Sequence, residues 1–111
     1  TVHAPRTTHH VHALAHITGG GFVDNIPRVL PEGLGARIRR GAWQVPPLFR
    51  LIQQGGGISD DEMLRTFNMG VGIIAVVAPE DLHDVEHSLE RRGEPSFVVG
   101  TVVEGAGVAF E

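Results

Sequence analysis

The chain has 111 residues, of which 41% are apolar and 20% charged, and its formal net charge is −4. This length suits one globular domain, and the negative charge without a basic patch argues against nucleic-acid binding. Because cysteine, lysine and tyrosine are absent, the sequence excludes disulfides, thiolate metal sites, Schiff bases and a Walker-type phosphate loop.

No apolar run approaches the roughly 20 residues that a membrane-spanning helix needs, and no signal-peptide pattern opens the sequence. We therefore expect a cytoplasmic protein without membrane contact. Residues 1–10 are polar and aperiodic, which predicts a flexible N-terminal arm or linker remnant. Residues 11–111 are expected to form one domain.

Strands are predicted where apolar residues alternate or run continuously, at 11–18, 36–40, 71–78, 97–103 and 108–110. Helices are predicted where apolar residues recur at helical spacing, at 22–30 with a kink at Pro27, 46–52, 59–67 and 79–92. The order β-α-β-α-α-β-α-β-β predicts an α+β (α/β-like) fold, a single mixed sheet with helices packed on it.

Three local features refine this assignment. Ser59 with Glu62 three residues later forms a capping-box pattern at the start of a helix. The continuous apolar run 71–78 is typical of a strand buried on both faces. The last two strands are expected to pair as a hairpin around 104–107.

The segment Gly19-Gly20-Gly21 lies between the first strand and the first helix. Glycines let the backbone turn so that N–H groups converge, and a helix N-terminus adds partial positive charge. Thr18 offers a hydroxyl, and Arg28 or Arg65 a charged clamp. Spacing alone favours a plain turn over an anion site, because most glycine-rich turns only turn.

Two longer blocks carry a resemblance. The first block, Ala15–Phe22 (AHITGGGF) followed by Asn25–Pro31 (NIPRVLP), and the second, Glu62–Gly72 (EMLRTFNMGVG), closely resemble the phosphoribosylformylglycinamidine cyclo-ligase (aminoimidazole ribonucleotide synthetase) family. Trp43, Pro46 and Phe49 are similar to its middle segment. The resemblance covers about residues 11–111 and concerns the C-terminal domain of that family.

The resemblance implies an ATP-dependent ring closure that converts formylglycinamidine ribonucleotide to aminoimidazole ribonucleotide in purine biosynthesis. It implies ATP and Mg²⁺ for the full enzyme, mostly bound by an N-terminal domain whose acidic and lysine-bearing segments this chain lacks. We therefore expect no cofactor and no metal in this chain alone, and no turnover without that domain. The expected partners are the ribonucleotide substrate, the N-terminal domain and a second copy in a homodimer or other self-association.

The resemblance assigns a substrate- or phosphate-binding role to His16, Thr18, Gly19, Gly20, Gly21, Asn25, Arg28, Arg65 and Asn68. Several members have a simpler interpretation that stays open. His16 could hydrogen-bond a neighbouring loop, and Asn25 before Ile-Pro is typical of a residue that bonds local backbone. Arg28 suits a solvated arginine, and Asn68 could hold its own junction together. No catalytic residue is assigned.

His83 and His87 have the i, i+4 spacing of two metal ligands on one helix face, but the zincin glutamate and a third ligand are missing. Exposed histidines are therefore favoured, and His3, His9, His10 and His12 form a loose cluster without an implied function.

Two alternatives to the enzyme domain remain. One is a non-catalytic association or anion-binding module. The other is a related enzyme such as formylglycinamidine synthetase, thiamine-monophosphate kinase or selenophosphate synthetase.

Overall fold

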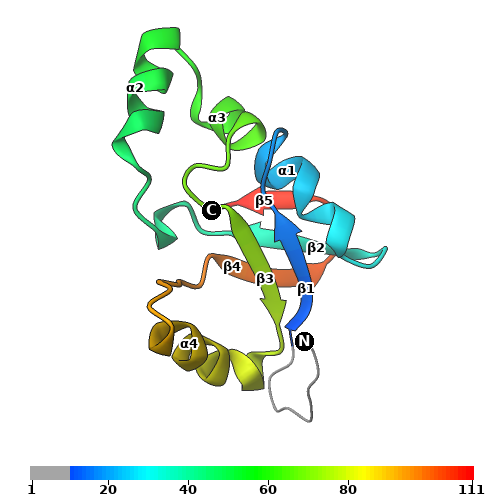
Figure 1. Cartoon of the computed structure of the whole chain (residues 1–111). Coiled ribbons are helices and arrows are strands. Elements are labelled where there is room, and N and C mark those ends of the chain that lie inside the picture. Colours follow the sequence, from blue (N-terminus) through cyan, green and yellow to red (C-terminus); the bar gives the residue numbers. More distant parts are fainter. Residues whose placement is uncertain (1–10) are drawn as a thin grey trace.

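The computed structural model describes residues 11–111 (Figure 1); the predicted arm at 1–10 lies outside the described residues. The helices and strands follow the predicted order: β1 (Val11–His16), α1 (Gly21–Asn25), β2 (Leu34–Ile38), α2 (Pro47–Gly56), α3 (Asp60–Thr66), β3 (Ile73–Val77), α4 (Leu82–Arg91), β4 (Gly100–Glu104) and β5 (Val108–Phe110). Short 3-10 helices span Pro27–Val29, Arg40–Ala42 and Pro79–Asp81. The α+β class is confirmed.

The strands form two sheets, where one mixed sheet was expected. β1 pairs antiparallel with β3, while β2 lies between β4, to which it is antiparallel, and β5, to which it is parallel. The expected hairpin of the last two strands is wrong, because β4 and β5 flank β2. Their connection crosses the end of β2, where Gly105 N donates to Gly33 O and Ala36 N donates to Gly107 O.

The first helix shows the predicted kink. α1 ends at Asn25 and a 3-10 helix begins at Pro27, because a proline has no N–H to continue the α-helical ladder. Phe22 and Ile26 from this segment are buried, and the Phe22 ring meets Trp43 edge-on at 5.5 Å between centroids. The apolar stripe therefore faces the core as its spacing predicted.

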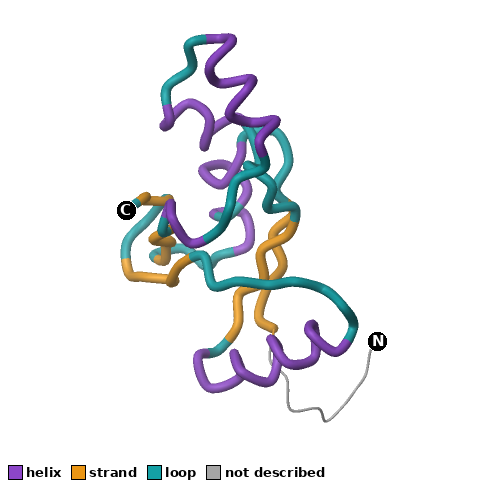
Figure 2. The backbone as a smooth tube through the Cα atoms, turned by 90° about the vertical axis from the view of Figure 1, so that its left-hand side faces the viewer, coloured by secondary structure: helices purple, strands orange, loops and turns teal. Residues whose placement is uncertain are grey.

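The core lies between the two sheets and the α1–α3 pair. It consists of the buried apolar residues Ala15, Ile17, Phe22, Ile26, Ala36, Ile38, Met63, Leu64, Met69 and Val71. Figure 2 shows the β1–β3 pair and the three-stranded sheet as separate groups of strands, with α4 lying across one end of the molecule. The inner faces of both sheets contribute to this core. The end of β1 and the loop that follows it lie at the border of the core.

β3 is not buried on both faces, contrary to the expectation from its continuous apolar run. Ile73 is 65% exposed, and Ala75 is also exposed, whereas Ile74 and Val76 are half-buried. Only one face of the β1–β3 pair packs against the core. The second face carries the exposed Leu14 and Ile73, and no layer of the described chain lies over it (Figure 1).

Candidate functional site

The glycine loop begins where β1 ends and turns the chain sharply into α1. Gly20 has φ 94° and Gly21 has φ 59°, which are left-handed values that glycine adopts at little cost. Gly21 N donates to Thr18 O at 3.0 Å. The loop is therefore a hydrogen-bonded turn that needs glycine at two successive positions.

The Asn25 side chain hydrogen-bonds this loop. Its side chain is buried, and Nδ2 donates to Gly21 O at 2.8 Å, to Thr18 O at 3.2 Å and to Gly19 O at 3.3 Å. Its Oδ1 accepts from Thr18 Oγ1 and from Arg28 Nη1, both at 3.3 Å. The carbonyls of the loop are thus turned inward, and the side chains of Thr18 and Arg28 meet on the same amide.

Two backbone N–H groups of the loop have no acceptor among residues 11–111. Within residues 11–111, the amides of Gly19 and Gly20 donate to no backbone or side-chain acceptor, and Gly19 is exposed with open space where a Cβ would lie. Gly20 is different, because a Cβ there would collide with the Asp24 carboxylate. Free donors and a negative charge therefore flank the same turn, with the open space at Gly19.

The second sequence block lies directly beside this loop. Ile17 N donates to Gly72 O at 2.8 Å, and a Cβ on Gly21 would collide with Leu64 O at the end of α3. Asn68 Oδ1 accepts from Gly70 N at 2.8 Å, so this asparagine stabilises the tight junction before β3. Two blocks that are far apart in sequence thus meet at one edge of the β1–β3 sheet.

Arg65 lies beside α1. It lines a pocket of about 230 Å³ together with Val23 of α1, Arg40 and Asp61, and Arg40 Nη2 lies 3.0 Å from Asp61 Oδ1. His16 is exposed on β1, opposite Ile73 of β3. Five of the nine predicted residues form the loop and its hydrogen-bond network: Thr18, Gly19, Gly20, Gly21 and Asn25. Arg28 joins this network through Asn25, and His16 precedes the loop. Asn68 belongs to the neighbouring junction, and Arg65 lines the pocket beside Val23.

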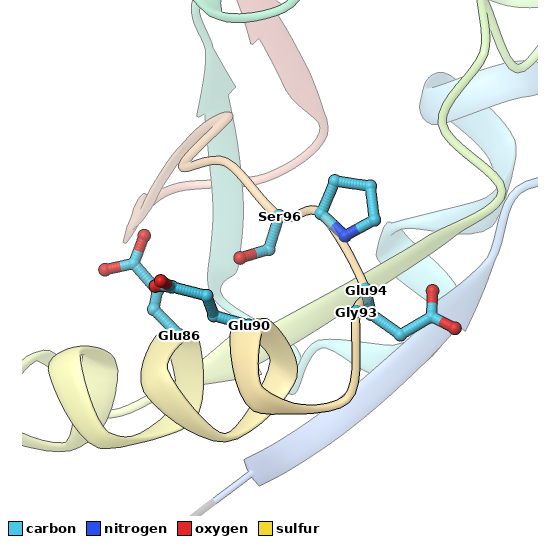
Figure 3. Close-up of a pocket in the computed structure, with 6 residues that line it drawn as sticks. Glu86, Glu90, Gly93, Glu94 and Ser96 are labelled. Atoms are coloured by element: carbon cyan, nitrogen blue, oxygen red, sulfur yellow. The ribbon is translucent and has the colours of Figure 1, made fainter.

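A larger pocket of about 440 Å³ lies at the end of α4, away from the glycine loop, and is lined by Glu86, Glu90, Gly93, Glu94, Pro95 and Ser96. Figure 3 shows Glu86 and Glu90 pointing from α4 to one side, whereas Glu94 points to the other side of the chain. In the described part of the chain, no group of three or more His, Cys, Asp or Glu side chains is placed to hold a metal ion.

Sequence reasoning missed two contributors to the site. Asp24 lies in the first turn of α1, where an acidic side chain complements the helix dipole, so this signal was present in the sequence. Trp43 Nε1 donates to Met69 O at 3.0 Å and holds the left-handed Met69 (φ 53°) in place. No local pattern predicts that bond, because its partners are 26 residues apart.

Within residues 11–111, no helix combines the length and the apolar content that crossing a bilayer requires.

Among solved structures, the thiamine-monophosphate kinase from Stenotrophomonas maltophilia K279a is similar with a TM-score of 0.66 at 14% identity, over 91% of this chain and 31% of that one. A protein from Thermus thermophilus gives a TM-score of 0.63 at 20% identity, over 90% of this chain and 32% of that one. These likenesses show a shared fold.

Sequence comparison shows the family. The phosphoribosylformylglycinamidine cyclo-ligases of Bacillus thuringiensis (strain Al Hakam) and Bacillus cereus (strain B4264) are each 49% identical to this chain over 102 residues, which is 92% of the chain. The chain spans only 30% of the length of these relatives. The profile of AIR synthase related protein, C-terminal domain, matches residues 2–111. The resemblance seen in the two sequence blocks is confirmed, and the chain belongs to the family of AIR synthase related proteins as a C-terminal domain.

Proposed function

We propose that this chain is the C-terminal domain of an ATP-dependent cyclo-ligase of purine biosynthesis, which converts formylglycinamidine ribonucleotide to aminoimidazole ribonucleotide. The 49% identity to cyclo-ligases supports this assignment. Because the chain spans 30% of their length, the rest of the catalytic machinery belongs to the part of the enzyme outside it. The chain alone is then inactive, and its place in the cell is the cytoplasm.

The observation that carries the proposal is the edge formed by the glycine loop and the 68–72 junction. Within residues 11–111, the backbone amides of Gly19 and Gly20 donate to no acceptor, and the Thr18 hydroxyl and the Arg28 guanidinium both donate to Asn25 Oδ1 beside them. Free backbone N–H groups close to a hydroxyl and a cation suit a phosphate group of a ribonucleotide. We place that phosphate at the Gly19 side, because the Asp24 carboxylate occupies the Gly20 side.

In the full enzyme, ATP supplies the phosphoryl group that activates the formyl-amide oxygen. The described residues offer backbone donors for a phosphate but no carboxylate cluster for Mg²⁺. The proposal therefore assigns the metal and most ATP contacts to the part of the enzyme outside this chain. The role of the loop is to bind and orient the substrate, and no catalytic base is assigned among these residues.

A titration with inorganic phosphate, followed by amide NMR, tests the binding role. We expect the Gly19 and Gly20 signals to shift. Replacing Asp24 with Asn should tighten phosphate binding by roughly fivefold, since a unit charge a few ångströms away contributes about 1 kcal/mol in water. Asp84→Asn, in the first turn of α4, is the matched control and should change nothing. Unmoved glycine signals would contradict the proposed site.

An assay of ring closure tests the catalytic role. The isolated chain should form no aminoimidazole ribonucleotide from substrate and ATP. A chimaera in which this chain replaces the matched 102 residues of the Bacillus cereus (strain B4264) enzyme should form it. Product from the isolated chain, or none from the folded chimaera, would refute the assignment.

A second candidate function is a non-catalytic association module. The exposed apolar residues of the chain favour it, since Leu14, Leu51 and Ile73 are each more than 60% exposed. Under this alternative the chain forms a homodimer or a larger assembly by itself. The ring-closure assay on the chimaera separates the two candidates, because an association module would not restore turnover.

A further inference from the structure

The outer face of the β1–β3 sheet is largely apolar. Leu14 is 62% and Ile73 65% exposed, and the antiparallel register places Leu14 opposite Ala75 and His16 opposite Ile73 on this same face. Neither strand contains Asp, Glu, Arg or Lys. We call this surface, formed by Leu14, His16, Ile73 and Ala75, the outer sheet face.

This composition differs from that of a sheet face built for water. An antiparallel sheet with one solvated face normally alternates apolar residues inward with polar residues outward. Here Ala15 on the inner face is 1% exposed, but Leu14 on the other face is apolar too. Figures 1 and 2 agree that no helix of residues 11–111 covers the outer sheet face. Exposed Leu14 and Ile73 on a face without charged residues suit an interaction site.

The outer sheet face also borders the candidate phosphate site. Ile73 directly follows Gly72, whose carbonyl accepts from Ile17 N at the start of the glycine loop. His16 is two residues before Thr18. A partner that packs on Leu14 and Ile73 therefore lies next to the glycine loop and can contribute groups to the phosphate site proposed there.

The partner that fits is the rest of the enzyme. The cyclo-ligase relatives are about three times as long as this chain, which spans 30% of their length. The remainder of such an enzyme therefore offers a large protein surface for packing. We infer that the part of the cyclo-ligase outside this chain packs on the outer sheet face, beside the glycine loop. This inference rests on the proposed function for its choice of partner.

Thiol labelling tests the inference, because the chain has no cysteine and each introduced one is the only thiol of the isolated chain. Ala75→Cys reports the outer sheet face, and Ala109→Cys on β5, also an exposed strand alanine, is the matched control. Each variant is labelled with a maleimide as the isolated chain, at a concentration at which it is monomeric, and within the Bacillus cereus chimaera. Peptide mass spectrometry gives the rate at each position.

We expect Cys labelling at position 75 to be roughly tenfold or more slower in the chimaera than in the isolated chain, since a packed interface excludes the reagent. Labelling at position 109 should not change. Equal rates at position 75, or a chimaera that does not assemble, would overturn the inference. Protection that grows with the concentration of the isolated chain and is absent from the chimaera would also overturn it and assign the face to a second copy.

The same chimaera separates this inference from the proposed function. Protection at position 75 without ring closure would retain the docking surface and refute the function. Ring closure without protection would retain the function and refute the docking surface.

Discussion

Asn25 connects the glycine loop to the helix that follows, and its amide is the main organiser of the candidate site. Its side chain donates to three loop carbonyls and accepts from Thr18 and Arg28. The position of Asn25 before Ile-Pro predicted hydrogen bonds to local backbone, and Asn25 makes them in the structure. The buried Asn25 side chain supports the loop conformation, and we propose that it contributes to binding through the amides at Gly19 and Gly20.

Replacing Asn25 with Ala should therefore lower the free energy of unfolding by about 2–4 kcal/mol, because three inward carbonyls lose their donor inside the fold. Urea unfolding measures this change. Asn68→Ala is the control, since Asn68 accepts one bond from Gly70 N, and it should cost only about 1 kcal/mol. Equal losses in both variants would show that the loop does not depend on the Asn25 network.

At the scale of single elements, α3 begins with a cap that the sequence predicts. Ser59 Oγ accepts from Glu62 N at 3.2 Å, and Asp60, Asp61 and Glu62 lie in the first turn, where negative charge is favourable. This helix holds Leu64, whose carbonyl lies against Gly21. The cap therefore contributes to the placement of the glycine loop.

Ser59→Ala should remove about 1 kcal/mol of stability, the usual cost of losing an N-cap, and lower the melting temperature by about 4–8 °C in a domain of this size. Calorimetry measures the shift. Ser88→Ala, within α4, keeps every cap and should leave the melting temperature nearly unchanged, because alanine is the better helix former. A melting temperature that responds equally to both changes would contradict the cap's role.

Local signals predicted the elements well, but not how the strands pair. Prolines, caps and glycines act within a few residues, so Pro27, Ser59 and the glycine turn could be read directly from the sequence. Pairing depends on contacts between distant residues: β2 accepts neighbours on both sides because Gly35 and Gly100 let backbones approach where a Cβ would collide. For the same reason the sequence could place Thr18–Gly21 in a loop but could not show that Arg65 lines a pocket with Arg40 and Asp61.

At the scale of the whole molecule, the chain is less compact than its length suggests. Its radius of gyration is 15.0 Å, whereas a compact domain of about 100 residues has about 13 Å. α2 projects from the body of the molecule (Figure 1), and α4 has no fully buried residue. Such a shape suits a domain that gains part of its buried surface from a partner.

Without that partner, the outer sheet face should draw copies of the chain together. We predict weak self-association of the isolated chain at high concentration, measured by light scattering, and a clear reduction in the double variant Leu14→Thr/Ile73→Thr, which keeps residues that suit strands. The matched control is Leu48→Gln/Leu51→Gln on α2, where exposure is similar at 61% and 67%. This control should associate like the parent chain, because α2 lies apart from the sheet. A strictly monomeric parent, or an equal effect of both double variants, would show that the outer sheet face has no special affinity for apolar surface.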